Sequence, residues 1–160
     1  MNVSSNDFKA EVQALQERYI NALDRKDMEG WLDCFSPNGG YICTTAENHS
    51  QNLPIAIMHD MSPECLRDRI KFIEKIWSGT YEDYTTRHFI QQVSWEDVED
   101  GVRINTSFLT SFVDKNGMSG LLATGCYEDE VEFVDGTPLF RKKIAIIDAS
   151  VTPRYLVYPL

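Results

Sequence analysis

Residues 45–60, TAENHSQNLPIAIMHD, contain two of the three histidines of the chain together with a glutamate and an aspartate. His49, His59 and Asp60 are the residue types that a mononuclear iron site with two histidines and one carboxylate requires. Neither helical nor strand spacing would bring His49 and His59 to one face. A Rieske cluster requires paired cysteine and histidine motifs, and no cysteine here is followed by histidine within three residues. We therefore predict no metal ligand and no cofactor-binding residue in this chain.

A second group of residues could perform acid–base chemistry. Tyrosine, carboxylate and histidine side chains that line an apolar cavity can have shifted pKa values, and the candidates are Tyr19, Asp24, Tyr41 and His88. Such residues more often satisfy a hydrogen bond in a core, so both interpretations stay open. The chain has no nucleophile elbow, phosphate-binding loop or dinucleotide fingerprint. We predict no catalytic residue.

Two segments contain side chains that would be unfavourable without a partner, one because of buried charge and the other because of exposed apolar surface. Arg87 and His88 begin an otherwise apolar strand, where charge is costly to bury without partners. They belong either to a satisfied network at the edge of a sheet or to a contact with another subunit. Residues 155–160 are mostly apolar at a free end, where a chain normally frays. We predict a subunit interface that includes Arg87, His88, Tyr155, Leu156, Val157 and Tyr158, and we expect deletion of 155–160 to impair assembly.

The composition is that of an ordinary globular protein. With 160 residues, 42% hydrophobic and 25% charged, the chain fits one domain, residues 1–160. A net charge of -10 opposes binding to nucleic acids and to anionic membranes. Neither a signal peptide nor a run of eighteen apolar residues is present, which favours a cytoplasmic protein. The cysteines lack paired spacing and are expected to be free core thiols: Cys34, Cys43, Cys65 and Cys126.

The elements that must position these residues begin with helices. Apolar residues at helical spacing predict a helix from Phe8 to Leu23, capped by Ser4 with Asp7. A second, short helix should run from Met28 to Phe35, stopped by the Pro-Gly-rich residues 36–40. A third should begin at Ser62-Pro63 and end at Ser78-Gly79.

The remaining segments have strand patterns. Residues 41–45 and 53–58 should form a short antiparallel hairpin. Turn signals then separate four long antiparallel strands at about 86–96, 102–113, 118–134 and 139–149. In the second of these, Val102, Ile104, Thr106, Phe108, Thr110 and Phe112 should share one face. Glu128, Glu130 and Glu132 should lie on a solvated face. We predict an α+β fold of the cone-shaped type shared by nuclear transport factor 2 and the cystatins, a curved antiparallel sheet covered by three helices.

Several motifs, in order, carry a family resemblance: DRKD from Asp24, RDR from Arg67, TRHFIQQV from Thr86, LLATGCYED from Leu121 and RKKIAIIDASV from Arg141. Together the motifs resemble the small (β) subunit of Rieske-type aromatic-ring-hydroxylating dioxygenases over almost the whole chain. TTAEN, the LP at residues 53–54 and the ending YLVYPL resemble the branch that acts on benzoate-like acids such as salicylate, anthranilate or terephthalate.

The resemblance implies a non-catalytic structural subunit of an oxidoreductase complex. Its partner would be a large α subunit that carries the Rieske [2Fe-2S] cluster and a mononuclear Fe(II), commonly as α3β3, with self-association of the small subunit as a trimer also possible. Electrons would come from NAD(P)H through a reductase or ferredoxin. The alternatives are a stand-alone isomerase or dehydratase of the same fold and a small-ligand-binding protein.

Overall fold

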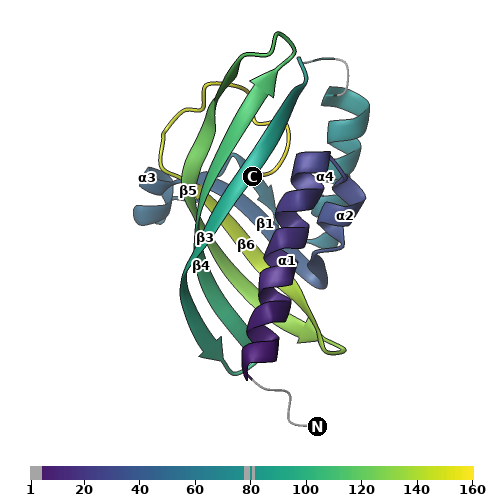
Figure 1. Ribbon diagram of the computed structural model, residues 1–160, viewed down its shortest axis with the longest axis vertical. Helices are drawn as coiled ribbons and strands as arrows, with labels where there is room; N and C mark the ends of the chain where they lie inside the picture. The colour runs from purple at the N-terminus through teal and green to yellow at the C-terminus, as the bar shows by residue number, and fades with distance from the viewer. Residues whose placement is uncertain (1–4, 78–79, 81) are drawn as a thin grey trace.

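The computed structural model describes residues 5–77, 80 and 82–160, and one curved sheet organises them (Figure 1). The sheet has six strands in the order β2-β1-β6-β5-β4-β3. Their bounds are Phe35–Thr45 for β1, Met58–Asp60 for β2, Tyr84–Val98 for β3, Gly101–Asp114 for β4, Ser119–Val134 for β5 and Thr137–Ile147 for β6. The helices are α1 Ser5–Arg25, α2 Met28–Leu32, α3 Ala46–Ser50 and α4 Pro63–Phe72, which continues into a π-helical turn, η1 Ile73–Trp77.

The first two helices form as the apolar spacing predicts, and a tight turn joins them. Lys26 adopts a positive φ of 57°. The Asp27 N–H donates to the Ala22 carbonyl oxygen at 2.9 Å, which closes α1 in a Schellman motif. The Asp27 side chain then accepts from the Gly30 N–H and caps α2. The predicted cap residue Ser4 and the predicted helix end at Ser78-Gly79 lie outside the described residues.

The segment after α2 differs from the prediction. Phe35 does not end a helix: it begins β1 and pairs with Phe140, and a bulge separates this pair from the next one at Gly40. The residues expected to stop a helix therefore lie within a strand, because a bulge accommodates proline and glycine without regular pairing.

The short hairpin exists, but its return strand lies later than predicted. The Thr45 hydroxyl accepts from the Asn48 N–H and caps α3, which interrupts the connection. Residues 53–57 form a loop that the Thr44 hydroxyl fastens by donating to the Ile55 carbonyl oxygen. The return strand is β2, which pairs Met58 with Cys43. A side-chain cap thus overrides the strand pattern of residues 53–58.

The four-stranded meander β3–β6 is confirmed, and each strand begins and ends within two residues of the predicted bounds. Val102, Ile104, Thr106, Phe108 and Thr110 of β4 are buried on one face. Glu128, Glu130 and Glu132 lie half-buried on the opposite side of β5 from buried Tyr127, Asp129 and Val131. One pairing was not predicted: β1 joins β6 in parallel, so the sheet is mixed.

Helices α1, α2 and α4 lie on one side of the curved sheet and α3 on the other (Figure 1). The α+β, cone-like fold is therefore confirmed. Its core gathers aromatic side chains from α1, α2, β1 and β6, of which the largest are Tyr19, Trp31, Tyr41 and Phe140. Among the described residues, no helix is both long enough and apolar enough to cross a bilayer. All four cysteines are free thiols, but only Cys34 and Cys43 are buried as predicted; Cys126 is half-buried and Cys65 is exposed. Burial raises the pKa of Cys43 to about 12.

Candidate functional site

The histidines of residues 45–60 do not converge with their carboxylates. His49 lies on α3, where its Nε2 is 3.3 Å from Glu128 Oε2. His59 is exposed on β2, and its neighbour Asp60 is buried and accepts two hydrogen bonds from Arg69, at 2.8 and 3.1 Å. Among the described residues, no three His, Cys, Asp or Glu side chains group as metal ligands would. The donors present do not fit an iron centre.

Two of the four acid–base candidates meet inside the cone. His88 Nδ1 lies 2.6 Å from Asp24 Oδ1, and the His88 side chain is only 1% exposed. Asp24 also accepts from the Thr86 hydroxyl at 2.9 Å and from the His88 N–H at 3.1 Å. The pair joins the end of α1 to the edge strand β3. His88 Nε2 is buried with no hydrogen-bond partner among the described residues.

The charge of Asp24 is stabilised by this geometry. Burial raises the pKa of Asp24, but the hydrogen bonds and the imidazole of His88, with the Thr86 hydroxyl, outweigh burial and hold the pKa below its ordinary value. A carboxylate with a depressed pKa that accepts three hydrogen bonds is a poor general base. The pair fits the interpretation of a satisfied core network.

The other two candidates, Tyr19 and Tyr41, hold the end of the chain. The Tyr19 hydroxyl donates to the main-chain oxygen of Leu160 at 2.7 Å. The Leu160 N–H donates to the Tyr41 hydroxyl at 2.9 Å. Burial raises the pKa of both tyrosines well above its ordinary value, so both remain neutral donors. These groups are therefore occupied by this chain's own backbone.

The cone interior also holds a buried ion pair that the sequence did not predict. Lys143 Nζ lies 2.8 Å from Asp129 Oδ2, and both side chains are almost fully buried. The ammonium lies against the rings of Tyr19, Tyr127 and Phe140, at 3.9 to 4.4 Å from their centroids. Burial raises the pKa of Asp129 and lowers that of Lys143. The alternation of side chains along β6 could have predicted that Lys143 points inward, because it shares its face with buried Ala145 and Ile147.

The predicted interface residues separate into inward and outward groups. Arg87 is exposed on the outer face of β3, so its charge is not buried, while its neighbour His88 points inward. The end of the chain packs against residues of this chain: Val157 is buried and its N–H donates to the Tyr84 hydroxyl, and Leu156 and Tyr158 are half-buried. Tyr155 exposes 68% of its surface.

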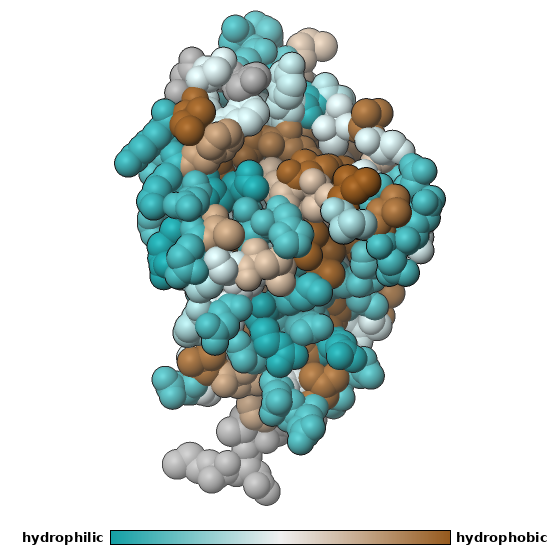
Figure 2. All heavy atoms as spheres, turned by 180° about the vertical axis from the view of Figure 1, so that it is seen from behind, coloured by the Kyte–Doolittle hydropathy of each residue, from teal (hydrophilic) through white to brown (hydrophobic). Residues whose placement is uncertain are grey.

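Two apolar surfaces surround these outward residues. The first, the outer-strand patch, consists of Arg87, Phe89, Leu109 and Leu121. These residues lie on adjacent strands, since Phe89 pairs with Leu109 and Ser111 pairs with both Arg87 and Leu121. The second, the tail groove, measures about 550 Å³, and its apolar lining includes Ile57, Trp77, Val151, Tyr155 and Leu156. Apolar side chains also gather around a hollow in the upper half of the rear face (Figure 2). Exposed apolar surface of this kind is typical of subunit contacts.

Comparison with known proteins gives the same family as the motifs. The profile of the family described as "Ring hydroxylating beta subunit" matches residues 18–154. The small subunit of anthranilate 1,2-dioxygenase from Burkholderia cepacia is 28% identical over 151 residues, which cover 94% of this chain and 92% of the relative. The β 2 subunit of the terminal oxygenase component of terephthalate 1,2-dioxygenase from a Comamonas species is 26% identical, with 94% and 97% covered.

Solved structures agree on the fold. The β subunit of benzoate 1,2-dioxygenase from Burkholderia mallei superposes with a TM-score of 0.73 at 20% identity, covering 92% of this chain and 93% of that one. A protein of cystatin-like fold from Nostoc punctiforme gives 0.62 at 16% identity, with 94% and 98% covered. The comparisons do not favour a stand-alone isomerase or dehydratase. The predicted resemblance is confirmed: the chain belongs to the ring-hydroxylating β-subunit family, the small subunits of multicomponent aromatic-ring-hydroxylating dioxygenases.

Proposed function

We propose that residues 1–160 form one domain that assembles with, and supports, a larger α subunit whose Rieske [2Fe-2S] cluster and mononuclear Fe(II) perform the chemistry. The observation that carries this proposal is the state of the cone interior. The four acid–base candidates and the buried ion pair are bonded within this chain: Asp24 with His88, Asp129 with Lys143, and Tyr19 and Tyr41 with Leu160. Such an interior supplies stability and shape rather than reacting groups.

The substrate in this proposal is a benzoate-like aromatic acid, hydroxylated at the α subunit. The relatives in support are named for anthranilate and terephthalate, both aromatic carboxylates. Electrons would arrive from NAD(P)H through a reductase or ferredoxin that the α subunit receives, and the complex would work in the cytoplasm.

The proposed assembly is α3β3. A closed ring of three requires heterologous contacts, in which two different patches of one chain meet its two neighbours. The outer-strand patch and the tail groove lie on different elements, and each exposes apolar side chains, among them Phe89 at 62% and Tyr155 at 68%. We propose that Arg87 and Tyr155 mark these two contact surfaces. His88, Leu156, Val157 and Tyr158 would then support them from within this chain.

Co-expression with a candidate α subunit tests the proposal. Native mass spectrometry should find a complex with equal numbers of the two chains, three of each. A chain that stays alone in the presence of the α subunit would contradict it. The α partner is recognised by the paired Cys-x-His and Cys-x-x-His motifs that a Rieske cluster requires.

A further inference from the structure

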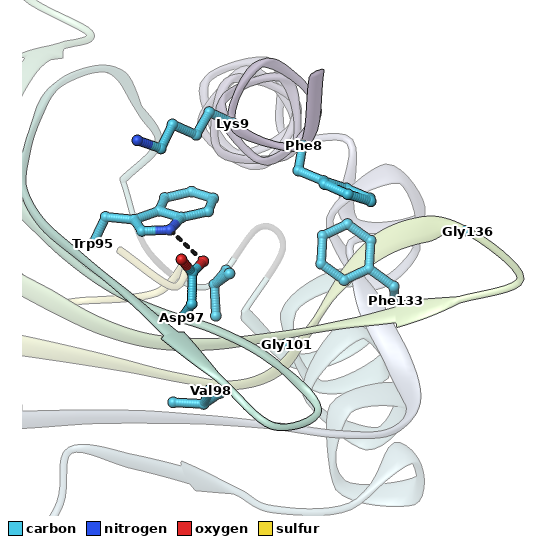
Figure 3. Close-up of a pocket in the computed structure, with 9 residues that line it drawn as sticks. Phe8, Lys9, Trp95, Asp97, Val98, Gly101, Phe133 and Gly136 are labelled. Atoms are coloured by element: carbon cyan, nitrogen blue, oxygen red, sulfur yellow. Dashed lines mark hydrogen bonds between the residues drawn. The ribbon is translucent and has the colours of Figure 1, made fainter. Parts of the chain in front are cut away.

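A pocket of about 600 Å³ lies between the first turns of α1 and the adjoining ends of β3, β4 and β5. It lies away from the tail groove and shares no residue with the Asp24–His88 pair. Figure 3 shows Lys9 and Phe8 reaching it from α1, Trp95 and Asp97 from β3, and Phe133 from β5. Its size is within the range of small-molecule sites.

The walls of this pocket are aromatic. Phe8 and Phe133 meet edge to face with ring centroids 5.1 Å apart. Trp95 lies across the opening from them, so that a slot separates the indole from the two phenyl rings (Figure 3). Val98 and Val102 add aliphatic lining. A flat ring in the slot would stack on the indole and meet the phenyl groups, which is how aromatic side chains prefer to pack.

One cation and one carboxylate stand at the rim. The Lys9 ammonium lies 5.7 Å from the centre of the Trp95 ring and forms no salt bridge with the carboxylates whose side chains the structure describes. Asp97 is fixed instead by the indole, whose Nε1–H donates to Asp97 Oδ1 at 2.8 Å. Lys9 lies on the helix side of the indole and Asp97 on the strand side (Figure 3). An anionic group beside the ring is therefore attracted on one side only.

We propose that this pocket binds a planar aromatic carboxylate of the benzoate class, with the ring in the slot and the carboxylate on Lys9. The ligand class follows from the pocket itself. That it coincides with the substrate class of the assembled oxygenase rests on the proposed function, in which case the small subunit binds substrate or product at a second site, away from the iron.

Calorimetric titration of the full chain with benzoate tests the proposal. Benzoate should bind, benzamide should bind at least tenfold more weakly because it lacks the charge, and cyclohexanecarboxylate should bind more weakly because it is not flat. Lys9→Met should raise Kd about tenfold or more, which corresponds to about 1.4 kcal/mol. Asp97→Asn keeps an acceptor for the indole and removes the opposing charge, so it should lower Kd.

The matched control is Lys75→Met, which removes another exposed lysine from η1, an element outside the pocket lining. Equal binding by the Lys9→Met and Lys75→Met chains would overturn the proposal, as would the absence of benzoate binding to the wild-type chain. If benzoate fails to bind but Trp95→Ala weakens capture of the α subunit, the pocket is a protein contact and the proposal is wrong. Assembly is measured in a separate experiment, so failure of the proposed function would leave the titration interpretable.

Discussion

Asp24, Asp60 and Asp129 each expose a tenth or less of their side chains, and each has a basic partner: His88, Arg69 and Lys143. The Asp24–His88 pair joins α1 to β3 across 64 positions, whereas Asp60 and Arg69 are 9 positions apart and Asp129 and Lys143 are 14 apart. Burial of an unpaired charge is costly, so removal of either partner should lower the free energy of unfolding of the chain.

The Asp24 carboxylate should make the stability of the chain depend on pH. Its folded pKa lies below its unfolded value of about 3.9, so its contribution is fully present above that value and is lost as pH falls through the folded pKa. We expect Asp24→Asn to lower the free energy of unfolding by about 1–3 kcal/mol at pH 7. The difference from wild type should shrink below about pH 4. Urea unfolding at pH 7 and pH 3.5 measures this, and a constant difference would refute it.

Removal of one partner of the Lys143–Asp129 pair should destabilise the chain much more than replacement of both partners by apolar residues. Lys143→Met alone would leave a buried carboxylate, and we expect a loss of about 3–5 kcal/mol. The double variant Lys143→Met with Asp129→Leu should recover most of this loss, because burial disfavours both charges. Chemical denaturation of the two single variants and the double variant gives the coupling energy, and additive losses would show that the two charges do not stabilise one another.

The sequence predicted residue types better than partners. Asp24 and His88 were both candidates, but nothing in their separation of 64 positions indicates that they meet. Lys143 was not predicted to be buried, although the alternation along its strand places it on the inward face. A buried lysine becomes plausible only when its partner, Asp129 on the neighbouring strand, is known.

Local patterns predicted helices and long strands well, because periodicity and turn residues are properties of neighbouring positions. The predicted bounds are wrong where the local structure depends on a side-chain cap or on pairing with a strand distant in sequence. Thr45 caps α3 and moves the return strand from 53–58 to Met58–Asp60. Phe35 and its neighbours form part of β1 because they pair in parallel with β6, about a hundred residues further along the chain.

The tail after β6 should act as a structural element of the cone. Leu160 is 1% exposed and its backbone is held by Tyr19 and Tyr41, so Leu160→Ala should cost about 2–4 kcal/mol of unfolding free energy. Tyr155→Ala, in the same segment but mostly exposed, should change it by less than about 0.5 kcal/mol. Thermal and urea unfolding compare the two, and equal effects would contradict the docked tail. Deletion of 155–160 therefore tests folding as well as assembly.

For the whole molecule, the two outward surfaces should control assembly independently of stability. Phe89→Ser and Tyr155→Ser should each weaken capture by the α subunit about tenfold or more while leaving the melting temperature nearly unchanged. Met118→Ser is the matched control, because Met118 is 66% exposed at a hairpin outside both surfaces. A pull-down titration with tagged α subunit measures the effect, and equal capture of all three variants would remove both surfaces from the proposal.

Product formation per mole of assembled, iron-loaded α subunit distinguishes a supporting subunit from a reacting one most directly. Complexes should be made with the wild-type chain and with Asp24→Asn, and a benzoate-class acid offered with reductant. We predict no product from this chain alone, and the same turnover within about twofold from both complexes once assembly is normalised. Turnover by the isolated chain, or a hundredfold loss in a fully assembled Asp24→Asn complex, would contradict the supporting role.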